Sequence, residues 1–326
     1  MMLLQRLGAA GMATARVDWQ QRVSAGLIGL LVGDALGVPY EFHPPESIPP
    51  ADLIEYAPPV GFQRAHVGVP PGTWSDDGAQ ALVLLDSLVA CDGLDLAHFA
   101  GGLRRWLLEG FYAVNRSVFD IGAQTSTALN RLGSGVPPEL SGPSGERDNG
   151  NGSLMRVLPL ALWHRGDDRE LMVLAARQSL PTHGHPRSQV ACALYCLWAR
   201  AALEEHPDPW SSGVSRFRNY GGLDLFPDAE VQRVLDPSNA ASVRGTGYVL
   251  DTLWSAKEAV EETSDFEGCV RRAISLGNDT DTTAAVAGGI AGLVHGLNRI
   301  PARWRECLRG RDLYEPLIVK MAGRLG

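Results

Sequence analysis

The sequence predicts an all-α protein that folds as a single compact multi-helix domain. Apolar residues recur three and four positions apart along most of the chain, as at Val23, Leu27 and Leu30, and this spacing is typical of a helix with one buried face. No segment alternates apolar and polar residues long enough to indicate a β-strand. Residues 284–289 contain only Ala, Gly and Val, and Gly inside a helix usually has a packing reason. We therefore expect close helix contacts there.

The helices follow from the same pattern, taken in chain order. They are predicted at residues 19–33, 78–91, 96–109, 121–132, 153–164, 168–179, 186–204, 247–261, 265–276, 281–296, 301–309 and 312–323. The first one ends where Gly37 and Pro39 stop helix growth. Residues 43–74, 133–152 and 205–246 are rich in Pro, Gly and polar residues and are predicted to be long loops, which are often functional in a compact domain.

No repeat and no clear linker divides the chain, so we predict one domain over residues 18–326. Residues 1–17 contain Arg6 and Arg16 and no acid, and they show no signal-peptide core with a cleavage site. We expect either a disordered extension there or a natural start at Met12.

Composition excludes several classes of protein. The chain has 326 residues, of which 45% are hydrophobic and 20% charged, as in ordinary globular proteins. A net charge of -8 gives no support for nucleic-acid binding, and no apolar stretch approaches the roughly twenty residues of a membrane span. The five cysteines are odd in number and lie mostly in apolar runs, which favours free thiols and a cytoplasmic location. Cys192 and Cys196, with His183 and His185 upstream, fit no zinc-finger spacing.

Two short acidic clusters carry most of the functional information. The first contains Ser75, Asp76 and Asp77, and the second contains Asp279, Asp281 and Thr282. Each opens a run of small apolar residues that reads as a helix. Carboxylates and hydroxyls are the ligands that hard divalent cations prefer. If the fold brings the clusters together, they could hold a pair of metals bridged by shared carboxylates.

Helix capping is the alternative explanation for each cluster. Ser and Asp before an apolar run are ordinary N-caps, and Asp in the first turn complements the helix dipole. Taken singly, each cluster fits capping better than metal binding. However, a cap needs one acceptor and each cluster supplies three polar side chains, and adjacent carboxylates repel each other unless a cation lies between them.

Three further stretches carry polar residues next to predicted helices. Glu41 follows the end of the first helix and either faces a pocket or lies in solvent. Asn151, Gly152 and Ser153 form a turn before a helix, which either binds an anion through its amides or is a plain turn with a Ser cap. His183 lies in a turn that could present its imidazole to a ligand, although a loop His is more often a surface residue. The chain lacks a Gly-x-Ser-x-Gly elbow, a Walker A loop and a Rossmann fingerprint.

Taken together, these segments resemble the ADP-ribosylglycohydrolase family. The matching segments occur in the expected order over roughly residues 20–310. They are residues 33–37 with Glu41, residues 73–77, residues 151–156, Thr182 with His183, residues 247–249 with Thr252 and Leu253, and residues 277–282. No single motif is decisive, but six in order are quite specific.

The resemblance implies an all-helical fold with two divalent cations, Mg²⁺ or Mn²⁺. The ligands that it implies here are Ser75, Asp76, Asp77, Asp279, Asp281 and Thr282. It favours metal binding over simple capping at both clusters, although capping can occur alongside.

The resemblance also implies a substrate site. The turn of Asn151, Gly152 and Ser153 would meet the diphosphate or ribose of ADP-ribose, with Met155 beside it, and His183 would contact the distal ribose or diphosphate. Tyr248 could stack on adenine, or could equally be a core aromatic.

Glu41 and Asp148 are the candidates for acid/base chemistry in the hydrolysis of a glycosidic bond. The resemblance also implies an arginine acceptor, because arginine-directed members of the family carry a carboxylate at a place similar to Asp148, where it could pair with a guanidinium.

The leading hypothesis is therefore a metal-dependent hydrolase that cleaves the N-glycosidic or O-glycosidic bond between ADP-ribose and an acceptor. The expected partner is an ADP-ribosylated protein, with arginine as the favoured modified residue, or a small ADP-ribosyl conjugate. Two alternatives remain at this point. One is another two-metal hydrolase that acts on a nucleotide or phosphate ester, and the other is a non-catalytic ADP-ribose-binding module.

Overall fold

The chain folds into α-helices joined by loops and short 3-10 helices, as the sequence predicts. The computed structural model describes residues 2–323, apart from the side chains of residues 2–18 and 322, and it contains no β-strand within that range. The predicted extension over residues 1–17 lies outside the described side chains, and its disorder stays a prediction. The α-helices are α1 (Met2–Gly37), α2 (Asp76–Cys91), α3 (Leu96–Glu109), α4 (Ala123–Gly133), α5 (Pro138–Ser141), α6 (Leu158–Trp163), α7 (Asp168–Ser179), α8 (Pro186–Leu203), α9 (Pro209–Asn219), α10 (Gly222–Leu225), α11 (Asp228–Leu235), α12 (Val249–Glu261), α13 (Phe266–Ser275), α14 (Thr280–His295), α15 (Ala302–Cys307) and α16 (Arg311–Gly323).

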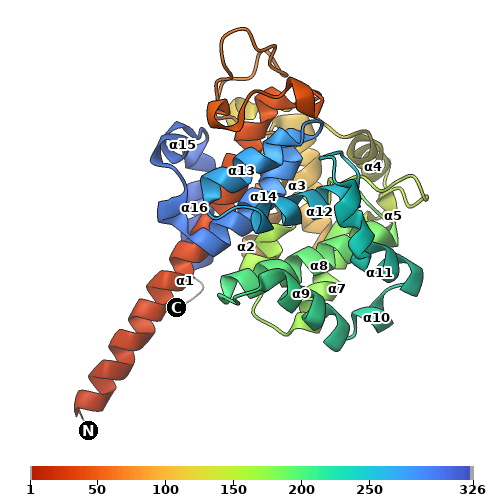
Figure 1. The fold of residues 1–326 in the computed structure, drawn as a ribbon. Helices are drawn as coiled ribbons and strands as arrows, with labels where there is room; N and C mark the ends of the chain where they lie inside the picture. The colour runs from red at the N-terminus through yellow and green to blue at the C-terminus, as the bar shows by residue number, and fades with distance from the viewer. Residues whose placement is uncertain (1, 324–326) are drawn as a thin grey trace.

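The second half of α1 and α14 lie side by side at the centre of the fold, with the other helices around them (Figure 1). Glycines allow their backbones to approach. A Cβ atom added at Gly29 would lie 2.3 Å from the carbonyl oxygen of Gly288, and one added at Gly33 would lie 2.1 Å from that of Ala284. The close contacts predicted from residues 284–289 are therefore confirmed.

The second half of α1 is a longer apolar stretch than the sequence analysis predicted. The segment Trp19–Tyr40 is 22 residues long with a mean hydropathy of 1.5, which is enough to cross a membrane by length and composition. The prediction that no apolar stretch approaches the length of a membrane span is therefore wrong. In the structure 89% of the apolar window is buried inside the protein, as expected for a core helix that is enclosed by neighbours on all sides.

The predicted loop over residues 205–246 is also wrong, because it contains α9, α10 and α11. Asp208 caps α9 by accepting a hydrogen bond from the Ser211 amide at 3.0 Å. Trp210 then packs edge-on between Trp198 of α8 and Trp254 of α12, with ring centroids 5.2 Å apart in both pairs. This aromatic contact fastens the segment to the core.

The helix predicted at residues 153–164 begins later than expected, at Leu158. Pro159 lies in its first turn, where a missing amide costs nothing. Residues 153–157 instead form turns, and these turns carry Leu154 and Met155 into the interior.

Candidate metal centre and substrate cavity

The first acidic cluster lies at the start of α2, and α1 holds it in place. Asp34, near the end of α1, is fully buried and accepts hydrogen bonds from the amides of Ser75 (2.8 Å) and Gly78 (2.7 Å). Ser75 is the N-cap of α2 and Asp77 lies in its first turn. Capping therefore does occur here, and it leaves the carboxylate of Asp77 available for other contacts.

The second cluster meets the first one, although about two hundred residues separate them in the sequence. Asp77 Oδ2 accepts hydrogen bonds from Ser75 Oγ (3.0 Å) and from Thr282 Oγ1 at the start of α14 (3.3 Å). The contact between α1 and α14 explains the meeting, because the Thr280 hydroxyl donates to the carbonyl oxygen of Gly37 at 2.8 Å. The fold thus satisfies the condition on which the metal hypothesis depended.

Buried carboxylates crowd this junction. Asp76, Asp77 and Asp281 are each at most 5% exposed. Burial raises the pKa of all three well above the usual range, and neighbouring carboxylates raise the pKa of each further. Like charges in a buried site oppose ionisation, so these side chains need a positive partner to be ionised together.

The donor atoms fit a pair of hard divalent cations. Oxygen atoms of Asp34, Asp77 and Asp281 lie within 4.8 Å of one another, as do those of Glu41, Asp279 and Asp281. Asp281 belongs to both groups, which is the arrangement expected of a bridging carboxylate. In addition, Asp77 Oδ1 and Asp281 Oδ2 are buried with no hydrogen-bond partner among the described residues. Buried polar atoms are normally paired, and a cation would pair both of these.

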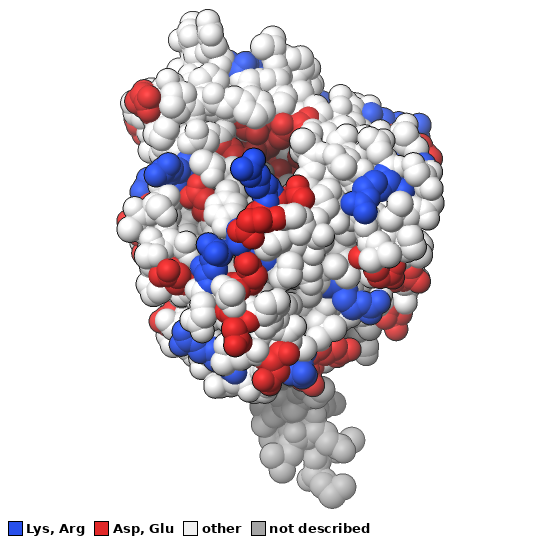
Figure 2. All heavy atoms as spheres, turned by 90° about the vertical axis from the view of Figure 1, so that its right-hand side faces the viewer, with Lys and Arg blue, Asp and Glu red and all other residues white. Residues whose placement is uncertain are grey.

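A cavity of about 520 Å³ opens above the carboxylates. The predicted site residues that line it are Glu41, Asp76, Asn151, Gly152, Met155, His183, Asp279 and Thr282. Ser75, Asp77 and Asp281 lie deeper, each no more than 3% exposed. Figure 2 shows acidic atoms gathered in a hollow near the top of the face that it presents. The described lining residues include no Lys or Arg.

The turn with Asn151 and Gly152 borders this cavity. The Asn151 side-chain amide donates to Asp279 Oδ2 and to Thr252 Oγ1, both at 2.9 Å. Gly152 has no room for a side chain, because a Cβ atom there would lie 2.8 Å from Cε1 of His183. The turn is therefore fixed against both α14 and His183.

His183 is 2% exposed, and its Nδ1 lies 2.8 Å from the Thr182 hydroxyl. Burial, followed by the nearby charge of Arg156, lowers its pKa from 6.5 to about 3. The imidazole is therefore neutral near pH 7 and acts in hydrogen bonding rather than as a cation.

This lowered pKa predicts an acid-dependent loss of stability. The unfolded chain binds a proton at His183 below about pH 6.5, whereas the folded chain does so only near pH 3. The fold should therefore lose stability as pH falls through this window. In chemical denaturation, we expect the free energy of unfolding to fall less steeply between pH 6.5 and 4 in His183→Gln than in the wild type. The exposed His206 provides the site of the matched control variant, His206→Gln. Equal slopes for His183→Gln and the wild type would contradict the prediction.

Besides the deeper residues Ser75, Asp77 and Asp281, three predicted catalytic or substrate-binding residues do not line the cavity. Asp148 Oδ2 accepts the amide of Gly145 at 2.8 Å and closes its own turn. The hydroxyl of Ser153 is fully buried beneath the site and bonds with that of Ser179 at 2.9 Å. Tyr248 is 39% exposed and its hydroxyl accepts from Arg187 at 3.3 Å. The roles assigned to these residues stay predictions.

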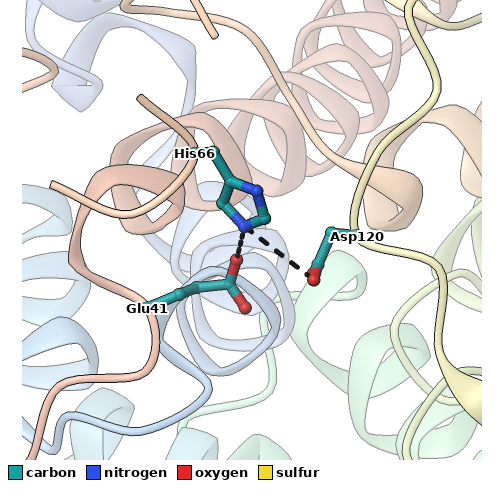
Figure 3. A group of neighbouring side chains, drawn as sticks. All are labelled: Glu41, His66 and Asp120. Carbon is teal, nitrogen blue, oxygen red and sulfur yellow. Dashed lines mark hydrogen bonds and ion pairs between the residues drawn. The ribbon is translucent and has the colours of Figure 1, made fainter. Parts of the chain in front are cut away.

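Two polar residues that the sequence analysis missed, His66 and Asp120, lie next to Glu41, and Asp120 also lines the cavity. Figure 3 shows His66 between Glu41 and Asp120, with its Nε2 atom 2.6 Å from Glu41 Oε2 and 3.8 Å from Asp120 Oδ1. Burial, and then the charges of Asp120 and Asp279, raise the pKa of Glu41 well above its usual range. Burial likewise raises the pKa of Asp120 to about 6. Neither His66 nor Asp120 belongs to a local motif, so no sequence signal marked them.

The geometry agrees with the comparison to known proteins. Residues 15–325 match the family model described as ADP-ribosylglycohydrolase. The chain belongs to the ADP-ribosylglycohydrolase family. Members of this family and its named relatives are hydrolytic enzymes, so this ADP-ribosylglycohydrolase is an enzyme, as the sequence analysis predicts.

Several relatives span most of this ADP-ribosylglycohydrolase. An ADP-ribosylarginine hydrolase of Pseudomonas putida is 31% identical, and the match covers 87% of this chain and 73% of that protein. An ADP-ribosyl-dinitrogen reductase glycohydrolase of Rhodospirillum rubrum is 28% identical, with 87% and 88% covered. A solved structure named as an ADP-ribosylglycohydrolase-related protein complex is 31% identical, with a TM-score of 0.77 over 95% of this chain and 99% of that one.

Proposed function

We propose that this protein is a metal-dependent hydrolase that releases ADP-ribose from an ADP-ribosylated arginine side chain of a protein. The observation that carries the metal dependence is the pair of oxygen groups that share Asp281. In addition, one buried carboxylate oxygen of Asp77 and one of Asp281 have no hydrogen-bond partner among the described residues. Two cations, Mg²⁺ or Mn²⁺, would be held by Ser75, Asp76, Asp77, Asp279, Asp281 and Thr282. The names of the Serratia and Pseudomonas relatives, both ADP-ribosylarginine hydrolases, support the arginine linkage.

The residues of the cavity bind and orient the substrate. Cations bound here would fix the ribose hydroxyls and lower the pKa of a bound water. The turn of Asn151 and Gly152 meets the diphosphate through its backbone, which suits a cavity whose described lining offers no Lys or Arg. His183 stays neutral and orients the sugar or diphosphate by hydrogen bonding.

Glu41 is the acid/base candidate that reaches the reacting centre. Its carboxylate is 2% exposed, lines the cavity and lies within 4.8 Å of oxygen atoms of Asp279 and Asp281. A carboxyl group that is buried beside other acids retains its proton to higher pH, and this suits it to protonate a leaving acceptor nitrogen.

The decisive assay follows free ADP-ribose by mass spectrometry. The purified protein is incubated with arginine-linked and serine-linked ADP-ribosylated peptides, with Mg²⁺ or Mn²⁺ and then with EDTA. We expect metal-dependent release from the arginine-linked peptide. Release of phosphate in place of ADP-ribose would indicate a hydrolase of phosphate esters, and binding without release would indicate a non-catalytic module.

Substitution of Glu41 separates chemistry from metal binding. We expect Glu41→Gln to lower kcat by about 10²- to 10⁴-fold, the usual contribution of a positioned acid or base. Mn²⁺ affinity, measured by calorimetry, should fall by much less than kcat, because Asp279 and Asp281 remain in the same oxygen group and the amide keeps the shape and one acceptor oxygen. Glu46→Gln, in the exposed part of the following loop, is the matched control. A kcat of Glu41→Gln equal to that of the control would remove Glu41 from the chemistry.

The five cysteines are unpaired, and this supports the proposal that the enzyme works in the reducing cytoplasm.

A further inference from the structure

An aromatic side chain stands in solvent beside the acid/base candidate. Phe42 directly follows Glu41, lines the cavity and is 70% exposed, whereas the Glu41 side chain is buried. An apolar ring in water gains free energy only when something covers it. The neighbourhood of Phe42 shows what kind of group could do so.

The backbone holds Phe42 in this position at a cost. Its φ angle is 63°, in the left-handed region that bulky residues rarely adopt. Two backbone hydrogen bonds impose it, from the Phe42 amide to the Asn278 carbonyl (2.7 Å) and from the Asn278 amide to the His43 carbonyl (2.6 Å). Asn278 is itself left-handed, at a φ of 60°. Strain of this kind concentrates at functional sites.

Phe42 is the outer member of a row of three rings. Its centroid lies 5.6 Å from that of His66, which lies 5.0 Å from that of Phe119. The carboxylate of Asp120 lies beside this row and lines the cavity together with Glu41. The cavity lining therefore combines the aromatic ring of Phe42 with the negative charge of Asp120. A flat cation satisfies both features, because a guanidinium stacks on a ring while its edge pairs with a carboxylate.

We propose that Phe42 and Asp120, supported by His66 and Phe119, form the subsite that receives the guanidinium of the acceptor arginine. The inference rests on the proposed function, in which ADP-ribose occupies the cavity with its diphosphate at the turn of Asn151 and Gly152. The acceptor then lies on the opposite side of the reacting carbon, past Glu41. Phe42 is accordingly a specificity-determining residue, and it does not take part in the chemistry.

The test compares Phe42→Ala, Phe42→Leu and Phe42→Trp with the wild type on an arginine-linked ADP-ribosylated peptide. We expect KM to rise about three- to tenfold in the Ala and Leu variants, the range of a partly exposed cation–π contact. The Trp variant should restore KM to near the wild-type value, and kcat should change less than KM in all three. Calorimetry with free ADP-ribose, which lacks the acceptor, should give the wild-type Kd throughout. Val67→Ala, which removes an exposed apolar side chain that follows His66 in the sequence and does not line the cavity, is the control.

Three results would overturn the inference. If Phe42→Leu keeps the wild-type KM, the contact is apolar packing and not a cation–π contact. If the Phe42 variants also lose affinity for free ADP-ribose, Phe42 contacts ADP-ribose and not the acceptor. If Phe42→Ala keeps the wild-type KM, Phe42 is not part of the site. A wild-type protein that releases nothing from the arginine-linked peptide would instead defeat the proposed function. In that case, titration of methylguanidine in the presence of ADP-ribose still tests the subsite, and equal affinity in the wild type and Phe42→Ala would overturn it.

Discussion

Asp281→Asn should abolish turnover and, in the absence of metal, leave the protein at least as stable as the wild type. Asp281 is fully buried, and one of its oxygens has no hydrogen-bond partner among the described residues. Burial, and then the neighbouring acids, raise its pKa well above the usual range. A folded-state pKa above the unfolded value destabilises the fold at any pH above the unfolded value. The amide removes that charge, and its oxygen can still accept the Thr282 amide hydrogen bond, which is 2.7 Å long in the wild type.

With metal present the order of stability should reverse. A cation that binds only the folded state raises its stability, so Mn²⁺ should raise the Tm of the wild type and not that of Asp281→Asn. Metal ions contribute several kcal/mol of transition-state stabilisation, so we expect kcat/KM to fall by about 10³-fold or more. Differential scanning fluorimetry with Mn²⁺ and EDTA, together with the ADP-ribose assay, measures both effects. Exposed Asp52→Asn is the control. An Asp281→Asn variant that still gains stability from Mn²⁺ would refute the shared-ligand assignment.

Gly37→Ala should also weaken the metal centre, because Gly37 of α1 packs against the start of α14, although Gly37 carries no functional group. A Cβ atom there would lie 2.3 Å from Asp281 Cα, 2.4 Å from Asp281 N and 2.5 Å from Thr280 O. All three neighbours are backbone atoms, which cannot rotate away as a side chain could. The start of α14 must therefore move. We expect a loss of about 1–3 kcal/mol of stability, as for other overpacked cores, together with weaker Mn²⁺ binding.

A matched control comes from Gly101, which lies within α3 with nothing within 4 Å of its added Cβ atom. There the gain in helix propensity is unopposed, so Gly101→Ala should stabilise the protein by about 0.5–1 kcal/mol. Denaturant unfolding of both variants and calorimetry with Mn²⁺ measure the contrast. Equal stability of the two variants would contradict the tight approach of α1 to α14.

The parts of the fold that sequence reasoning predicted are those with local signals. Ser75 and Asp95 are N-caps, and the predicted starts of α2 and α3 lie within two residues of the observed ones. The three helices in residues 205–246 were not predicted, because Pro and Gly usually mark loops. Here they lie at helix starts, such as Pro209 and Gly222. Their stability comes from tertiary contacts, such as that of Trp210, which the local pattern does not record.

In the site, too, sequence reasoning found the residues that have a local signal and missed those that have none. The two acidic clusters stood out because each concentrates ligands within a few residues. His66 and Asp120 are single polar residues in loops, and only the folded chain places them beside Glu41. Conversely, Ser153 and Tyr248 lie in conspicuous segments, yet the backbone turns their side chains away from the cavity. Sequence proximity to a motif therefore did not determine which way a side chain points.

The contact between Asp77 and Thr282 spans 205 residues, and this has a consequence for biosynthesis. A ribosome supplies the chain from its N-terminus, so α1 and α2 emerge long before α14 exists to complete their carboxylate set. Until then the growing polypeptide carries Asp34, Asp76 and Asp77 without their counterparts. The candidate centre therefore forms only after the start of α14 has been synthesised, and a product that ends before it would lack Asp279, Asp281 and Thr282.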